Sequence, residues 1–314
     1  VEQIAVLDRT KEAGSIGEPL YQNVRSIVDS KISVFGGRYG LGSKDILPKD
    51  VVATFENLVA EQPKNNFTVG IIEDLTNTSL TASRDIDVNP AGTKACKFWG
   101  LGSDGTVGAN KSAIKIIGDY TDMYAQGYFH YDSKKSGGIT VSHLRFGNTP
   151  IMAPYLINKA DYVAVHNQSY VDKYDVTSGL KKGATFLLNC TWTPEEVEAH
   201  LPGKIKKYFA DNDIKFYTID AVKIAKEIGL GGRINMIMQS AFFKLADIIP
   251  IEDAVKYLKD AVEHSYGKKG QKIVDMNNAA IDMGINAIVE IPVPAEWANA
   301  DTSVGAPEPT GNDF

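Results

Sequence analysis

Cysteine and histidine are scarce in this sequence, and that scarcity excludes several kinds of site. Its 314 residues include only two cysteines, Cys96 and Cys190, and each lies at the edge of an apolar run. Two isolated thiols cannot ligate an iron–sulfur cluster by themselves. We therefore expect both to be reduced and buried, as in cytoplasmic proteins. The five histidines show no zinc-type pairing, so we expect no metal site in this chain.

Long apolar runs and an excess of basic residues are also lacking. No run approaches the roughly 20 residues that a membrane-spanning helix needs, and the first residues show no signal-peptide pattern. The formal net charge is −6, whereas binding a nucleic-acid backbone requires a basic surface. The sequence therefore predicts neither a membrane nor a nucleic acid as partner. Local basic patches can still bind a small anion.

The segment from Cys96 to Lys111 carries the most information. Its apolar start is typical of a buried strand, and glycines then interrupt it at positions 100, 102, 105 and 108. From Val107 the apolar positions fall on one face of a helix, and Lys111 and Lys115 share another. Unpaired N–H groups and the positive dipole end at a helix start favour an anion. The segment predicts a phosphate-bearing ligand, and the alternative is a tight turn needed only for packing.

Apolar periodicity predicts an α/β unit in the first 91 residues. Three strands alternate with two helices, which is the order of a parallel sheet; the expected strands are 4–7, 31–36 and 67–72. Ser15 is the expected N-cap of the first helix, with Glu18 at the capping-box spacing. Its expected apolar face is Leu20, Val24, Ile27 and Val28. In the second helix, 48–62, the residues expected to face inward are Val52, Phe55, Leu58 and Val59.

A second α/β domain is expected from residue 92 to about 300, after the polar connection 77–92. Two expected strands, 124–131 and 139–146, flank the turn 133–138 and suggest a hairpin of open strand polarity. Further expected strands are 162–166, 185–190 and 214–219. A proline at position 194 follows the expected N-cap Thr193. The tail is expected to be helical over 235–249, 251–266 and 271–288, with Gly284 as a candidate break.

Three other groups of polar residues are candidates for contacts. A charged loop carries Asp8, Arg9, Lys11 and Glu12. It predicts either a contact with a phosphate or another domain, or a solvated loop whose ion pairs contribute little. Strand alternation puts His143 and Arg145 on one face, at an interface or on an exposed sheet. His166, at a strand end, is expected to be a packed, hydrogen-bonded histidine.

Two long motifs, one in each predicted domain, resemble segments of pyruvate:ferredoxin (flavodoxin) oxidoreductases. They are LDRTKEAGSIGEPLY at 7–21 and CKFWGLGSDGTVGANK at 96–111, with shorter matches at 142–147, 166–167 and 231–236. The resemblance implies an internal piece of a polypeptide that decarboxylates pyruvate on thiamine diphosphate and forms acetyl-CoA. That polypeptide passes electrons through iron–sulfur clusters to ferredoxin or flavodoxin. The apolar strand at the very start of the chain also suggests a piece of a longer protein.

The resemblance implies a fold of two three-layer α/β/α domains. Residues 1–91 resemble a transketolase C-terminal domain with a mainly parallel sheet. Residues 92–300 resemble a gamma-type domain with a mixed sheet and a helical tail, and residues 301–314 form a linker tail. Thiamine diphosphate, Mg²⁺ and [4Fe–4S] clusters are expected in the remaining domains of a cytoplasmic, homodimeric parent. The chain alone is therefore expected to be inactive.

Coenzyme A is the ligand that the resemblance implies for the gamma-type domain. Its diphosphate and 3′-phosphate suit a glycine turn, a helix start and lysines. The expected contacts are Gly102, Ser103, Gly105, Thr106, Val107, Asn110 and Lys111. Two alternatives stay open. One is a structural module without a ligand. The other is a nucleotide-binding domain of another oxidoreductase. That alternative is weakened because this sequence lacks the acidic residue expected about 20 residues after the glycines and beyond a second strand.

Overall fold

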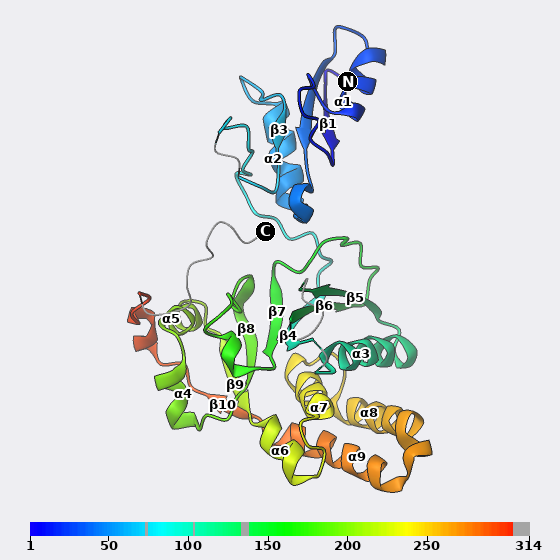
Figure 1. The fold of residues 1–314 in the computed structure, drawn as a ribbon, viewed down its shortest axis with the longest axis vertical. Helices are drawn as coiled ribbons and strands as arrows, with labels where there is room; N and C mark the ends of the chain where they lie inside the picture. The colour runs from blue at the N-terminus through cyan, green and yellow to red at the C-terminus, as the bar shows by residue number, and fades with distance from the viewer. Residues whose placement is uncertain (73–74, 103, 133–137, 304–314) are drawn as a thin grey trace. The chain divides into compact units, whose positions relative to one another are not determined.

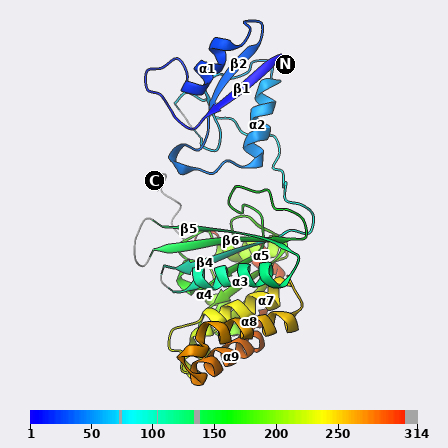
Figure 2. The ribbon, with the colours of Figure 1, turned by 90° about the vertical axis from the view of Figure 1, so that its right-hand side faces the viewer.

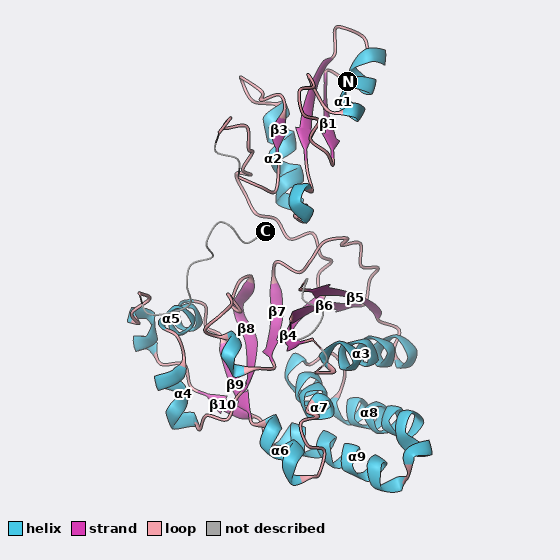
Figure 3. Ribbon diagram, viewed as in Figure 1, coloured by secondary structure: helices cyan, strands magenta, loops and turns pink. Residues whose placement is uncertain are grey.

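The computed structural model describes residues 1–72, 75–102, 104–132 and 138–303. Within them the chain forms two compact units. The N-terminal unit comprises Val1–Val88 and Ala153–Leu156, and the C-terminal unit comprises Asn89–Met152 and the residues from Ile157 onward. Both mix strands with helices, as the predicted α/β class requires (Figure 3). In this described part, no helix has the length and apolar character needed to cross a bilayer.

The N-terminal unit contains a three-stranded parallel sheet in the order β1-β2-β3, as predicted. Its elements are β1 (Gln3–Asp8), α1 (Pro19–Ile27), β2 (Ser33–Arg38), α2 (Pro48–Leu58) and β3 (Phe67–Thr68). The two helices lie on either side of the strands (Figure 2). Strand β3 is much shorter than the predicted 67–72, because Gly70 adopts a φ of +79° and turns the chain out of the extended conformation.

A carboxylate from the end of β1 caps helix α1. The two oxygens of Asp8 accept hydrogen bonds from Leu20 N at 3.0 Å and Tyr21 N at 3.1 Å. Ser15 was expected in this role, but its hydroxyl donates to Gly17 O at 2.6 Å and the helix starts at Pro19. The prediction of a Ser15 N-cap is therefore wrong. Asp8, expected in a charged loop, is instead buried and satisfies the helix start.

Helix α2 buries mainly polar residues, and of the four apolar residues predicted to face inward it leaves Val52 and Leu58 half-buried and exposes Phe55 and Val59. Its buried residues are Asp50, Ala53, Thr54 and Asn57. Asp50 accepts from Leu47 N at 2.8 Å, and the Asn57 side chain exchanges two hydrogen bonds with the Lys64 backbone. Phe55 is 65% exposed and Val59 84%, so the prediction that they face inward is wrong. The helix is amphipathic, but its hydrogen-bonded polar side chains are the ones that reach the sheet side.

The stability of the N-terminal unit should therefore depend on Phe67 and scarcely on Phe55. Phe67 is fully buried, so Phe67→Ala is expected to lower the free energy of unfolding by about 3–5 kcal/mol. Phe55→Ala removes a ring that is largely in solvent, so we expect a change within roughly 0.5 kcal/mol. Urea denaturation of the two variants measures the difference. Equal losses would contradict the outward orientation of α2.

A seven-stranded mixed sheet forms the centre of the C-terminal unit, in the order β10-β9-β8-β7-β4-β6-β5. The strands are β4 (Lys94–Leu101), β5 (Tyr124–Tyr131), β6 (Ile139–Gly147), β7 (Ala160–Val165), β8 (Leu180–Asn189), β9 (Lys215–Ile219) and β10 (Val289–Ile291). The inner strands β9, β8, β7 and β4 are parallel, and both edges are antiparallel. The predicted hairpin β5–β6 is confirmed, and its polarity is antiparallel.

Helices cover both faces of this sheet. They are α3 (Thr106–Tyr120), α4 (Pro194–His200), α5 (Gly203–Asp211), α6 (Ala221–Glu227), α7 (Asn235–Ala246), α8 (Ile251–Tyr266) and α9 (Gln271–Asn286). One core joins α3 and α6–α9 to one face, and another joins α4 and α5 to the opposite face (Figure 1). Pro194 opens α4 as predicted. Helix α9 runs through Gly284 without the expected break. The glycine instead allows close packing of α9 on α7, because a Cβ there would overlap Ser240.

Candidate functional site

The glycine-rich turn lies where two parallel strands end side by side. Strands β4 and β7 pair from Cys96↔Tyr162 to Trp99↔Val165, and His166 N then donates to Trp99 O at 2.9 Å. Helix α3 starts five residues after β4 ends. The turn thus lies at the carboxyl end of the parallel strands, the edge where α/β proteins commonly bind ligands.

Packing alone accounts for two of the glycines in the turn. Gly105 precedes α3 with a φ of +87°, and a Cβ there would overlap the side-chain amide of Asn235. A Cβ at Gly100 would collide with the Thr106 side chain. By contrast, a Cβ at Gly108 would enter open space. The first two glycines are required by close approach, whereas Gly108 is not.

A carboxylate already lies at the start of α3. The two oxygens of Asp104 accept from Leu101 N at 2.8 Å and from Thr106 N at 2.7 Å. Gly102 N donates to Gly138 O at 2.7 Å. Two of the backbone amides expected to meet a ligand are therefore satisfied within the protein. Among the described residues, the amides of Val107 and Gly108 find no acceptor, as is usual in the first turn of a helix.

The side chains predicted to bind a ligand separate into buried and accessible ones. Thr106 is 1% exposed, and its Oγ1 lies 2.8 Å from His166 Nδ1. Asn110 is also buried, and its Nδ2 has no acceptor in the described part of the chain. Lys111 is exposed, with Nζ 5.3 Å from the centroid of the Phe129 ring. The remaining predicted residue, Ser103, lies outside the described residues.

His166 is the packed, hydrogen-bonded histidine that its position predicts. Besides its contact with Thr106, its carbonyl accepts from Asn189 Nδ2 at 2.9 Å, and its ring lies edge-on to Phe98. Burial lowers the pKa of His166 to about 4. The neutral ring therefore links the end of β7 to the first residue of α3.

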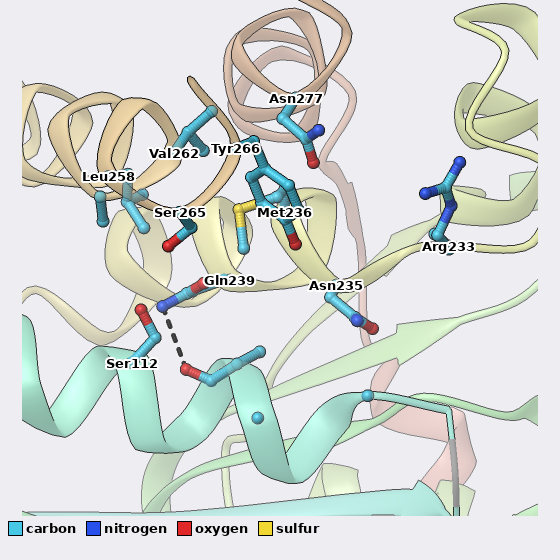
Figure 4. Close-up of a pocket in the computed structure, with 14 residues that line it drawn as sticks. Ser112, Arg233, Asn235, Met236, Gln239, Leu258, Val262, Ser265, Tyr266 and Asn277 are labelled. Atoms are coloured by element: carbon cyan, nitrogen blue, oxygen red, sulfur yellow. Dashed lines mark hydrogen bonds between the residues drawn. The ribbon is translucent and has the colours of Figure 1, made fainter. Parts of the chain in front are cut away.

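Two cavities flank the start of α3. The first, which we call the turn cavity, measures about 290 Å³, and its walls include Gly102, Gly105, Val107, Asp104 and Asp132. The second, which we call the helix cavity, measures about 350 Å³ and lies between α3, α7, α8 and α9 (Figure 4). Three of the predicted ligand residues line the turn cavity, whereas only Gly105 also lines the helix cavity.

On the opposite face of the sheet, Lys97, His143 and Arg145 form a buried row of basic residues that the sequence reasoning predicted only in part. His143 and Arg145 do share a face, but both are buried, so this is not an exposed sheet surface. Lys97 lies opposite His143 in the register, and its Nζ donates to Ser178 O at 3.0 Å. Burial lowers the pKa of Lys97. Burial first, and then Lys97 and Arg145, lower the pKa of His143 to about 3.

The two cysteines have the properties of structural thiols. Both are free and buried, and burial raises the pKa of Cys190 to about 11 and that of Cys96 further. Neither is therefore a low-pKa nucleophile or ligand. Within the described residues, no three His, Cys, Asp or Glu side chains are grouped as metal ligands.

About two thirds of the chain has a fold that is also found in a solved structure. The chain is similar to the pyruvate oxidoreductase subunit PORC of Thermotoga maritima, with a TM-score of 0.51, 18% identity, and 63% of this chain and 98% of that chain covered. The family model for pyruvate ferredoxin/flavodoxin oxidoreductase matches residues 95–287. The chain therefore belongs to the pyruvate ferredoxin/flavodoxin oxidoreductase family, as the two motifs suggested.

Longer relatives contain nearly the whole chain. It is 62% identical over 312 residues to the pyruvate-flavodoxin oxidoreductase of Enterobacter agglomerans, covering 98% of this chain and 27% of that relative. It is 60% identical over 303 residues to the pyruvate:ferredoxin oxidoreductase of Moorella thermoacetica, covering 96% and 26%. The chain thus spans about a quarter of the length of these curated relatives, consistent with the expected internal fragment.

Acidification is expected to destabilise the C-terminal unit, because it contains two histidines that folding holds neutral. Their folded pKa values, about 4 for His166 and about 3 for His143, lie below the ordinary 6.5. Below pH 6.5 the unfolded chain binds more protons than the folded chain, so the free energy of unfolding decreases as the pH is lowered. Each histidine contributes up to about 1.4 kcal/mol per pH unit until its folded pKa is reached.

Urea denaturation between pH 7 and pH 5 measures this slope. His166→Gln should remove about half of the histidine contribution, since two histidines of similar burial share it. His264→Gln, at an exposed histidine of α8, is the matched control. A slope that His166→Gln leaves unchanged would show that its protonation is not suppressed by folding.

Proposed function

We propose that this chain is part of an enzyme that oxidatively decarboxylates pyruvate to acetyl-CoA and transfers the electrons to ferredoxin or flavodoxin. Family membership and 60–62% identity to relatives bearing these names support the proposal. The remaining three quarters of such a polypeptide would supply thiamine diphosphate, Mg²⁺ and the iron–sulfur clusters. This chain has two cysteines, both buried, so it cannot ligate a cluster alone.

Within that enzyme, the start of α3 is proposed to hold coenzyme A at the turn cavity. The observation that carries this proposal is the position of Gly102, Gly105 and Val107 on its wall. Lys111 lies one helical turn beyond Val107 and so shares its side of α3. The amide of Val107 has no acceptor among the described residues, and it belongs to the positive end of the helix dipole.

The charges around the turn cavity set the expected affinity. Asp104 and Asp132 both line it, and carboxylates disfavour a phosphate. The charge of Asp104 is partly neutralised by its two backbone hydrogen bonds. We therefore expect weak binding by this chain alone, with neighbouring domains of the parent completing the site.

Calorimetric titration of the chain with coenzyme A tests the proposed site. Lys111→Gln is expected to weaken binding about three- to tenfold, because an exposed charge contact contributes roughly 1 kcal/mol. Lys223→Gln, at an exposed lysine of α6, is the matched control and should bind coenzyme A as tightly as the unchanged 314-residue chain does. Absence of heat at millimolar coenzyme A, or equal loss in both variants, would refute the site.

The purified chain is expected to be inactive toward pyruvate. It lacks the cysteines for electron transfer, and the resemblance places the thiamine-binding residues in other domains. Incubation with pyruvate, coenzyme A, thiamine diphosphate, Mg²⁺ and a viologen acceptor should leave the viologen oxidised. Sustained reduction would show that the chain contains a complete catalytic site.

A second role, for the N-terminal unit, is to dock against other parts of the parent. The outward apolar residues of its helices favour this role: Leu20 and Ile27 of α1, and Val51, Phe55 and Val59 of α2, are all exposed. Each helix thus carries exposed apolar side chains on its own side of the strands, and neighbouring apolar side chains such as those of α2 are typical of a surface that other protein covers. This scaffolding role is compatible with coenzyme A binding in the other unit.

A further inference from the structure

Strand β5 forms one edge of the seven-stranded sheet and lacks the features that usually protect such an edge (Figure 1). It is eight residues long, its register with β6 runs without a shift, and it contains no Lys, Arg, Asp, Glu or Pro. The opposite edge strand, β10, is only three residues long and carries Glu290. Natural sheets avoid long uncharged edges, because their free backbone groups pair with other strands. We therefore expect a partner strand at β5 and none at β10.

The hydrogen-bonding register shows which backbone groups of β5 point outward. At the end of the ladder Asp132 N donates to Ile139 O at 3.0 Å, and hydrogen-bonded pairs recur at every second residue of an antiparallel ladder. The even-numbered residues of β5 therefore bond to β6. In the described part of the chain, no strand pairs with the other side of β5. The N–H and C=O groups that point to this open side belong to the odd-numbered residues Ala125, Gly127, Phe129 and Tyr131.

These outward groups are self-complementary about Tyr128. In an antiparallel pair, residues with outward groups must lie opposite each other. A two-fold axis at Tyr128 places Ala125 opposite Tyr131 of a second copy. It also places Gly127 opposite Phe129, so that every outward group of the strand is used. An axis at any neighbouring residue would leave at least one of these residues unpaired.

The side chains of β5 suit the same axis. Tyr128 is 57% exposed, and two such rings meet across the axis, where an aromatic pair stabilises neighbouring strands. The Phe129 ring of one copy covers the bare backbone at Gly127 of the other, as aromatic residues do for glycines in edge strands. The pairing thus removes apolar surface from water as well as satisfying backbone groups.

The charges beside the edge also fit a second copy. Helix α3 packs beside β5 and runs in the opposite direction, since Lys111 Nζ lies 5.3 Å from the ring centroid of Phe129 and the helix ends shortly before the strand begins. Exposed Lys111 thus lies toward one end of the edge and exposed Asp119 and Asp122 toward the other, with Lys115 between them. A two-fold axis reverses the second copy, so each basic end meets an acidic end.

We propose that the chain pairs with a second copy of itself through β5, antiparallel and about a two-fold axis at Tyr128, so that two seven-stranded sheets become one. Backbone hydrogen bonds of the outward residues supply the attraction, as in other cases of strand addition. The Tyr128 pair and the contacts of Lys111 with the acidic end fix the register. The contact involves one strand and one helix of each copy, so we expect a dimer that dissociates in the micromolar range.

Sedimentation velocity of the 314-residue chain between about 1 and 300 µM tests the pairing, and the chain should shift from monomer to dimer as its concentration rises. Tyr128→Asp places two carboxylates opposite each other and should raise the dissociation constant about tenfold or more. Val289→Asp, at an exposed residue of the other edge strand β10, is the matched control. It should dimerise as tightly as the unchanged chain does. Circular dichroism verifies that both variants fold.

Charge reversal tests whether two copies meet at this position. Tyr128→Lys alone should dimerise as poorly as Tyr128→Asp, because two ammonium groups then face each other. An equimolar mixture of the two variants should form the dimer again, because a carboxylate then faces an ammonium group. A general loss of stability in either variant cannot produce this recovery.

Three outcomes would overturn the proposal. A chain that stays monomeric over this concentration range would leave the edge to another part of the parent polypeptide. A dimer that Tyr128→Asp leaves intact would show that pairing occurs at another surface. A mixture of the two charged variants that stays monomeric would show that the axis does not lie at Tyr128. None of these variants alters Lys111 or the proposed coenzyme A site, so the result does not depend on coenzyme A binding.

Discussion

The C-terminal unit depends on how the start of helix α3 is fixed to the sheet. Asp104 bonds to an amide on each side of the turn, and Thr106 joins the helix to His166 at the end of the neighbouring strand. The imidazole in the second contact is neutral at ordinary pH, because burial lowers the pKa of His166 to about 4. The glycines let the chain approach this closely, but these polar contacts determine where the helix points.

Because the start of α3 is fixed, it separates two spaces of different character. On one side lies a cavity whose wall holds Gly102, Val107 and two carboxylates; on the other lies one that has Arg233 and no carboxylate among its described residues. The same helix dipole therefore acts on two environments. A negative group gains from the dipole on both sides, and the neighbouring side chains decide how strongly each side retains it.

Local pattern predicted much of this arrangement. The strand, turn and helix around Gly105, the β5–β6 hairpin and the packed His166 all follow from short-range signals that tertiary structure did not override. The pattern did not show that the Asp104 carboxylate already accepts hydrogen bonds from the amides at the helix start. That carboxylate competes with any external anion. Nor could the pattern reveal the helix cavity, because Arg233 and Gln239 lie more than 120 residues after the turn and reach it only through the packing of α7 on α3.

The failure at helix α2 has a different cause. Apolar periodicity identifies a face but not what that face contacts, and here Asp50 and Asn57 make hydrogen bonds inside while Phe55 and Val59 face outward. Folding of the unit thus places little constraint on positions 55 and 59. Sequence variation at these two positions should therefore track whatever surface adjoins them in each relative, so that a change of residue there marks a change of neighbour.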